Sequence, residues 1–295
     1  MRCDGPALAG HNPYQQPGRF PRSMTPISPT YQNILVMGKS GAGKQPRIDV
    51  LAKEFGLKQL STGDIFRHYI GLMSKFGLLV HQRDLRDEDG SLLPDSQIRE
   101  ILAPYSSSSK ELEELLLGVK ASAYVNTGLF VPDELVNQLV DDAFGKRNYR
   151  GTILDGYPRT VAQAHHLLEM VEREGTTVDL VVLVDNDDEA IVRRTVGRRI
   201  CPRCSKVFHL EYKPPKEGRF CTSCGTQVVQ RTDDTEERIW SRLREFYDKV
   251  EPTIEFLEDK GIPVAVVPGN LPEFTEEAVR TSVLDAIREV EGEDS

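Results

Sequence analysis

The segment Asn33–Arg47 reads NILVMGKSGAGKQPR and joins an apolar run to a glycine-rich turn. Its first residues predict a short buried β-strand that feeds a tight turn. From Gly38 to Lys44 the spacing is G-x-x-x-x-G-K, in which the glycines permit positive φ and the lysine brings a mobile positive charge. Such a turn at the start of a helix is suited to binding phosphate groups. A glycine-rich turn whose lysine faces solvent is the simpler alternative.

The segment departs from the general pattern directly after Lys44. A serine or threonine normally follows the lysine, but this chain has Gln45 and Pro46. The hydroxyl is therefore absent, and proline has no N–H to donate. Since one charge-assisted hydrogen bond contributes about 1.5–3 kcal/mol, we expect the two losses to cost about a hundredfold in nucleotide binding or rate. Gln45 or Arg47 could supply a replacement donor.

Strand and helix patterns alternate after this segment. Four more apolar runs predict strands: Leu57–Ser61, Gly151–Gly156, Val178–Asp185 and Ile262–Gly269. Helical spacing of apolar residues predicts five helices: Arg47–Gly56, Thr160–Glu174, Asp187–Arg199, Thr235–Gly261 and Glu273–Glu291. Continuous β-branched strands that alternate with helices are typical of a parallel sheet covered on both faces. We therefore expect a doubly wound α/β core with five parallel strands.

Two segments interrupt this alternation. The first runs from Thr62 to about Asp133 and the second from about Ile200 to Thr232. Within the first, residues from about 78 to 114 contain an acidic stretch and a run of serines. We interpret them as an insertion of unknown role.

The second interrupting segment carries four of the five cysteines of the chain, at Cys201, Cys204, Cys221 and Cys224. Two C-x-x-C pairs at this separation are typical of a structural zinc site. Four protein ligands leave no open position for a substrate, so we expect the metal to make the segment rigid rather than to act in catalysis. The alternatives are paired disulfides, unliganded thiols, or a zinc ribbon that binds nucleic acid.

Charge and composition restrict the remaining classes of function. The net charge is −9, which does not support a chain-wide nucleic-acid surface. No apolar run reaches the length of a membrane span. Residues 1–30 are dense in proline and glycine and predict a disordered or targeting extension. We expect a cytoplasmic location, or a mitochondrial or plastid one if the extension is a targeting segment.

Three blocks downstream of the glycine-rich turn resemble the adenylate kinase family in its long-lid form with a zinc-binding lid. They are LSTGDIFR at 60–67, LDGYPRTVAQA at 154–164, and VGRRICPRC to REFYD at 196–248. The resemblance covers the chain from about Asn33 onward except for the insertion. It implies a P-loop NTPase-like doubly wound five-stranded parallel sheet. It also implies a domain at 31–295 with two inserted subdomains, an AMP-binding one at 62–133 and a zinc lid at 200–232.

The resemblance implies the following residues on the ATP side: Gly38, Gly41, Ala42, Gly43, Lys44, Gln45, Arg194, Arg198 and Asn270. Arg194 would lie near the adenine and Arg198 near the phosphates. Asp155 would position Mg²⁺ through water. The family loop normally reads Gly-Lys-Gly-Thr, so Gln45 and Pro46 depart from the family as well as from the general pattern.

On the AMP side the resemblance implies Thr62, Arg67, Leu129, Val131, Arg159, Gln163, Arg231 and Arg242. Thr62 and Gln163 would contact the adenine, and a glutamine favours AMP because related cytidylate and uridylate kinases usually carry asparagine in this region. The charged groups that would act directly on the phosphates are Lys44, Arg159, Arg198, Arg231 and Arg242. A solvent-exposed salt bridge is the simpler interpretation of any single arginine.

The resemblance therefore implies reversible phosphoryl transfer, ATP + AMP to two ADP, as a part of adenine nucleotide homeostasis. It implies Mg²⁺ with ATP, a structural Zn²⁺, no membrane or nucleic-acid partner, and a monomer. The alternative is a catalytically impaired relative that binds or senses nucleotides, because of the altered loop.

Overall fold

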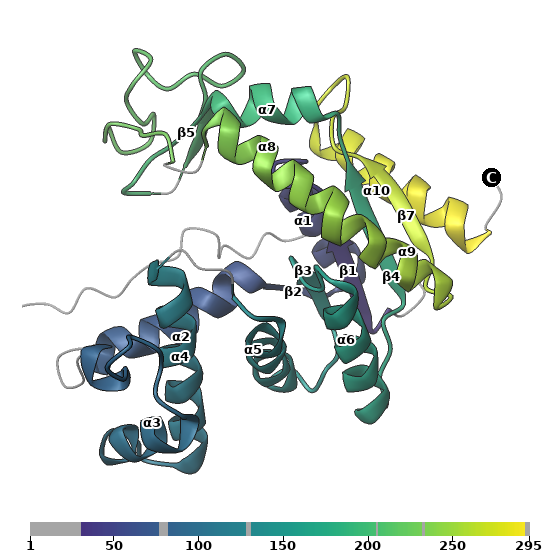
Figure 1. Ribbon diagram of the computed structural model, residues 1–295. Helices are drawn as coiled ribbons and strands as arrows, with labels where there is room; N and C mark the ends of the chain where they lie inside the picture. The colour runs from purple at the N-terminus through teal and green to yellow at the C-terminus, as the bar shows by residue number, and fades with distance from the viewer. Residues whose placement is uncertain (1–30, 77–81, 128–130, 205, 232–233, 293–295) are drawn as a thin grey trace, which may run out of the picture.

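The computed structural model describes residues 31–76, 82–127, 131–204, 206–231 and 234–292 of the 295-residue chain. A five-stranded parallel sheet lies at its centre, in the order β2-β3-β1-β4-β7 (Figure 1). Its strands are β1 Asn33–Met37, β2 Lys58–Ser61, β3 Thr152–Asp155, β4 Leu180–Asp185 and β7 Val264–Pro268. All five predicted strands form, and the expected fold class is confirmed. The N-terminal extension lies outside the described residues.

Helices cover both faces of this sheet. One face carries α1 Lys44–Phe55 and α10 Glu276–Glu291, and the other carries α5 Asp133–Gly145, α6 Val161–Arg173 and α9 Glu251–Asp259. The central strand β1 explains this division, because its side chains alternate in direction. Ile34 and Val36 pack in the first core, whereas Leu35 and Met37 pack in the second. All five residues of β1 are buried, as a central strand covered on both sides requires.

The predicted helix at Arg47–Gly56 begins three residues earlier than expected, at Lys44. Its N-cap is Gly43, which has a left-handed conformation with φ of 102°. Pro46 therefore lies inside the first turn. The fold tolerates it there because the first N–H groups of a helix have no intrahelical acceptor.

The predicted helix at Thr235–Gly261 is interrupted. It consists of α8 Glu236–Glu245, a π-helical turn at Phe246–Val250 (η3), and α9. Pro252 follows the π-helical turn and lies in the first turn of α9. Proline has no backbone N–H to donate to the carbonyl of the preceding turn. The wider π-helical turn accommodates this missing hydrogen bond, so the helix continues into α9.

The first interrupting segment folds into a helical unit of its own. It contains α2 Thr62–Phe76, η1 Gln82–Leu85, α3 Asp95–Leu102, η2 Ala103–Tyr105 and α4 Ser109–Thr127. A separate apolar cluster holds η1, α3 and α4 together: Leu85, Ile98, Leu102, Leu115, Leu116 and Val119. The sequence predicted extra material here but not this packing.

The second interrupting segment projects from the sheet between α7 Asp188–Val196 and α8 (Figure 1). It contains the antiparallel pair β5 Arg198–Ile200 and β6 Val207–His209. The helical unit and this segment extend to the same side of the sheet and stay apart from each other (Figure 1). Among the helices of the described residues, none has the length and apolar character that a membrane crossing needs.

Candidate functional site

A cavity of about 510 Å³ lies at the carboxyl ends of the central strands. Its lining includes Lys44 and four arginines that come from different parts of the chain, namely Arg159, Arg198, Arg231 and Arg242. The structure therefore brings together all five charged groups that the sequence predicted to act on phosphates. Five positive side chains around one cavity make it suitable for a polyphosphate.

The glycine-rich loop forms one wall of this cavity, with positive φ angles of 135°, 89° and 102° at Gly38, Gly41 and Gly43. A side chain at Gly38 would be impossible, because a Cβ atom there would lie 2.3 Å from the carbonyl oxygen of Val184. Lys44 curls back over the loop, and its Nζ donates to the carbonyl oxygens of Gly38 at 3.0 Å and Lys39 at 3.2 Å. Burial lowers the pKa of the Lys44 ammonium.

Gln45 does not direct its amide toward this loop. Its Nε2 donates to Asp49 Oδ1 at 2.9 Å and to Gln59 Oε1 at 3.0 Å. Gln59 in turn donates to Asp155 Oδ2 at 2.9 Å. Gln45 is therefore linked through Gln59 to Asp155, the predicted Mg²⁺ residue, and does not serve as a replacement donor in the loop.

The turn after β7 packs directly on the glycine-rich loop. A Cβ atom at Gly269 would lie 2.2 Å from the carbonyl oxygen of Ala42, so only glycine fits this approach. Ala42 is fully buried, and Asn270 follows as an exposed residue. Arg194 reaches the same loop from α7 and donates to the carbonyl oxygen of Gly41. The predicted ATP-side residues thus meet at one edge of the sheet.

Arg198 is already paired in this structure. Its guanidinium makes a two-pronged contact with Asp234, at 2.9 Å and 2.6 Å. The Asp234 side chain is fully buried, whereas that of Arg198 is 27% exposed. The carboxylate therefore holds the guanidinium in a fixed orientation at the cavity wall.

A second cavity, of about 430 Å³, adjoins the first and shares Gly63, Gly156, Arg159, Glu245 and Lys249 with it. Its lining includes four of the residues predicted for the AMP side: Thr62, Val131, Arg159 and Gln163. Apolar side chains complete the wall at Phe66, Val131 and Val136. A cavity with an apolar wall at one end and an arginine at the other suits a nucleoside monophosphate.

The amide of Gln163 is engaged at both ends. Its Oε1 accepts from the N–H of Arg159 at 2.8 Å, and its Nε2 donates to Asp133 Oδ1 at 2.7 Å. An adenine that binds here would have to share or replace these partners.

Of the other predicted AMP-side residues, Arg231 and Arg242 line the first cavity only, and Arg67 lines neither cavity. Arg67 is 72% exposed and pairs with Asp64 at 2.5 Å on the surface of α2. Its guanidinium nevertheless lies next to Gly63, which lines both cavities. Leu129 lies outside the described residues.

Two charged residues that the sequence analysis missed line both cavities. Glu245 ends α8, and Lys249 lies in the π-helical turn that follows. Their spacing of three and seven residues from Arg242 could have shown that they share its helical face. They place one negative and one positive charge at the junction of the two cavities.

Lys39, also missed, connects the glycine-rich loop to α7. Its Nζ lies 2.7 Å from Asp188 Oδ1 and 5.0 Å from the centre of the Tyr247 ring. Burial lowers the pKa of Lys39, but the contacts with Asp188 and Tyr247 outweigh it and hold the pKa above its ordinary value. Lys39 therefore stays charged and joins the loop to the start of α7 and to the π-helical turn after α8.

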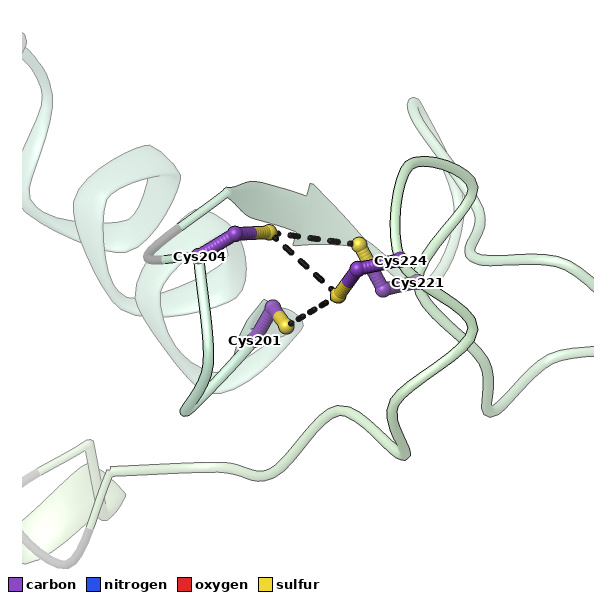
Figure 2. A group of neighbouring side chains, drawn as sticks. All are labelled: Cys201, Cys204, Cys221 and Cys224. Carbon is purple, nitrogen blue, oxygen red and sulfur yellow. Dashed lines mark hydrogen bonds between the residues drawn. The ribbon is translucent and has the colours of Figure 1, made fainter. Parts of the chain in front are cut away.

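The four cysteines of the projecting segment face one another (Figure 2). Their Sγ atoms all lie within 4.8 Å of each other, and three pairs are separated by 3.4, 3.5 and 3.6 Å. None forms a disulfide, since bonded sulfurs would lie about 2.05 Å apart. Four thiolates around a tetrahedral ion at about 2.3 Å would be separated by about 3.8 Å, so this donor set fits a metal such as zinc.

Hydrogen bonds with the side chain and the backbone of Thr226, and with Cys201, lower the pKa of Cys224 to about 6. A lowered pKa favours the thiolate, which is the form that binds metal.

Comparison with known proteins supports one family. The family model described as "Adenylate kinase" matches residues 108–262. The matched range contains the arginines of the cavity and the four thiols, and it begins one residue before α4. The glycine-rich loop lies outside it.

Several curated relatives carry the same description over a larger part of the chain. The adenylate kinase of Symbiobacterium thermophilum is 32% identical over 257 residues, which cover 87% of this chain and 98% of the relative. That of Thermoanaerobacter sp. strain X514 is 33% identical and covers 79% and 89%. That of Clostridium tetani is 30% identical and covers 79% and 90%.

Proposed function

This chain belongs to the adenylate kinase family, and from this premise we propose that it catalyses reversible phosphoryl transfer, ATP + AMP to two ADP. The observation that carries the proposal is the convergence of Lys44 and four arginines on one cavity, next to a second cavity with Thr62 and Gln163. Phosphoryl transfer needs alignment and neutralisation of charge more than covalent chemistry.

On the ATP side, the phosphates would lie along the loop from Gly38 to Gln45, with Lys44 on the β- and γ-phosphates. Arg194 and Asn270 would flank the adenine, and Arg198 would hold the phosphates. The contacts of the turn at Gly269 with Ala42 support this placement, because they hold the two walls of the site together.

On the AMP side, Arg159 would hold the phosphate, with Arg67 able to reach it from beside Gly63. Thr62, Val131 and Gln163 would surround the adenine, and Leu129 would join them. Arg231 and Arg242 would bridge the two phosphate chains. The helical unit would then form most of an AMP-binding subdomain at 62–133.

The transfer itself needs no general base, because the AMP phosphate is already ionised at neutral pH. One of its oxygens would attack the γ-phosphorus in line as the bond to the β-phosphate breaks. The segment at 200–232 would act as a lid that closes on the nucleotides and excludes water. It projects to the same side of the sheet as the helical unit, which supports such a closure (Figure 1).

Two metal ions would serve different purposes. Mg²⁺ would arrive with ATP, and Asp155 would orient it through water. Zn²⁺ would be held by Cys201, Cys204, Cys221 and Cys224 and would stabilise the lid; their mutual distances support this set of ligands. We further propose that ATP, AMP and ADP are the only partners needed and that the protein acts as a monomer.

A coupled assay with ATP and each nucleoside monophosphate tests the proposal. We expect AMP to be the preferred acceptor, with ADP as the product. If no ADP forms from AMP while both nucleotides still bind, the chain is a nucleotide-binding relative without kinase activity, and the proposal is wrong.

A further inference from the structure

We propose that Arg47 is a positioning residue for the ATP site, which holds the glycine-rich loop in place of the groups lost at Gln45 and Pro46. The inference rests on the proposed function, because it takes this loop as the ATP site. According to this inference, Arg47 offsets the changes at Gln45 and Pro46, and it does so from the same turn of α1.

Arg47 is fully buried, which is unusual for an arginine. Its Nη1 donates to the carbonyl oxygen of Gly43 at 3.2 Å, and its Nη2 donates to the carbonyl oxygen of Pro268. The guanidinium also lies 5.3 Å from the centre of the Phe274 ring. One side chain therefore ties the glycine-rich loop to the turn after β7.

The contact with Gly43 has a defined effect on the loop. A trans peptide is planar, so its C=O and the following N–H point in opposite directions. Holding the Gly43 carbonyl oxygen thus fixes the direction of the Lys44 N–H, away from Arg47. This N–H belongs to the first turn of α1, where donors have no intrahelical partner and are free to bind an anion.

The charge of Arg47 is not neutralised by the protein. Within the described part of the chain, neither Arg47 nor its neighbour Arg194 has a carboxylate within 4 Å, and both donate to backbone carbonyls. A hypothetical Cβ atom at Gly43 would lie 3.2 Å from Arg194 Nη2 and 3.3 Å from Arg47 Nη1, so both guanidiniums lie against the same peptide. Two adjacent cations without a counter-charge favour the binding of an anion such as the triphosphate of ATP.

Other candidates for this role are excluded by their contacts. Gln45 is directed toward Asp49 and Gln59. Pro46 has no N–H. Among the three residues that follow Lys44, Arg47 alone contacts the loop through its side chain in this structure.

The test compares Arg47→Lys and Arg47→Gln with Arg280→Gln as a matched control. Arg280 also contacts α1, but it does so at the surface, through Glu54 at 2.8 Å and 3.0 Å. Binding of ATP and of AMP is measured by calorimetry, and the KM of each by the coupled assay. We expect Arg47→Gln to weaken ATP binding about tenfold or more. Arg47→Lys should weaken it less, and AMP binding should stay within about twofold. AMP binding also reports that the variants are folded.

A second comparison tests the compensation directly. Gln45→Gly with Pro46→Thr restores the family loop and should raise activity, and Arg47→Gln in that background should cost less than in the natural one. Equal losses on Arg47→Gln in the natural and in the restored loop would contradict the proposal. It would also be contradicted if Arg47→Gln left ATP binding unchanged, or weakened ATP binding only as much as AMP binding. Calorimetry tests the role of Arg47 separately from the proposed function. Even a protein that does not catalyse the reaction would lose ATP affinity on Arg47→Gln if the role of Arg47 is correct.

Discussion

The two segments inserted into the sheet obtain their rigidity in different ways. The helical unit at 62–127 has a cluster of six buried apolar side chains from η1, α3 and α4. Among its described residues, the projecting segment that we propose as a lid has a cluster of four buried residues, and two of them are the thiols Cys201 and Cys221. An apolar cluster of this size cannot hold a segment alone, so we expect the proposed lid to need a bound metal and the helical unit to need none.

Of the changes predicted here, removal of the metal should lower activity most, and it should disturb the structure of the lid but not that of the sheet or its helices. Cys221→Ser removes one of the four ligands, and we expect it to abolish most activity, by about a hundredfold or more, since the lid could no longer hold its arginines in place. Metal analysis should give one zinc per natural chain and less for the variant. Circular dichroism should show that the helices persist. If Cys221→Ser unfolded the sheet, or kept full activity without metal, the lid would not be the one part of the molecule that depends on metal.

The matched pair Val119→Ala and Val125→Ala tests the helical unit. Both residues belong to α4, but Val119 lies in the apolar cluster at 3% exposure and Val125 is 46% exposed. We expect Val119→Ala to lower the free energy of unfolding by about 2 kcal/mol and Val125→Ala by less than about 0.5 kcal/mol. Thermal or denaturant unfolding measures both. Similar losses for the two variants would show that this cluster does not hold the unit.

A smaller effect is expected where the helical unit joins the core. Tyr69 of α2 donates to Asp142 of α5, and Lys146 of α5 lies 2.7 Å from Asp142 and 2.8 Å from Glu114 of α4. Burial raises the pKa of Asp142, but the contacts with Lys146 and Tyr69 outweigh it, and the pKa lies below its ordinary value. The anchor of the helical unit is therefore partly electrostatic.

The sign of this effect follows from the lowered pKa. A carboxyl group whose pKa is lowered by folding stabilises the protein above its unfolded pKa of about 3.9, and the contribution is lost as the pH falls through the folded value. Asp142→Asn should thus cost about 1–2 kcal/mol at pH 7 and less below about pH 4. Unfolding measured at both pH values checks this. A cost that is independent of pH would show that shape, and not charge, is responsible.

The sequence predicted the parts of this molecule that have strong local patterns. Short apolar runs such as Val178–Asp185 predicted all five strands, and the C-x-x-C pairs predicted the thiol cluster. Both signals depend on residues that are close together in the sequence. The packing of 82–127 was not predicted, since its helices are separated by polar turns and meet only through contacts between residues distant in sequence.

The candidate site shows the same limit. Lys44 and the arginines were recognised because they lie beside motifs, and the structure brings them to one cavity. Lys249 was missed because only its spacing from Arg242 pointed to it, and the π-helical turn that carries it was not predicted. Arg47 was noticed as a donor, but its burial beneath Phe274 depends on the end of the chain, which folds back onto α1.

The order of the strands has a consequence for how the chain tolerates its insertion. β2 and β3 are neighbours in the sheet, yet 90 residues separate Ser61 from Thr152, of which about 37 belong to the segment that we interpret as an insertion. The entropy lost when the ends of a connection meet grows only with the logarithm of its length, by about 0.6 kcal/mol for each doubling. Because the insertion less than doubles this connection, it adds less than about 0.6 kcal/mol to the closure of the sheet. A long crossover between adjacent strands is thus a place where a fold of this kind can gain new surface with almost no loss of stability.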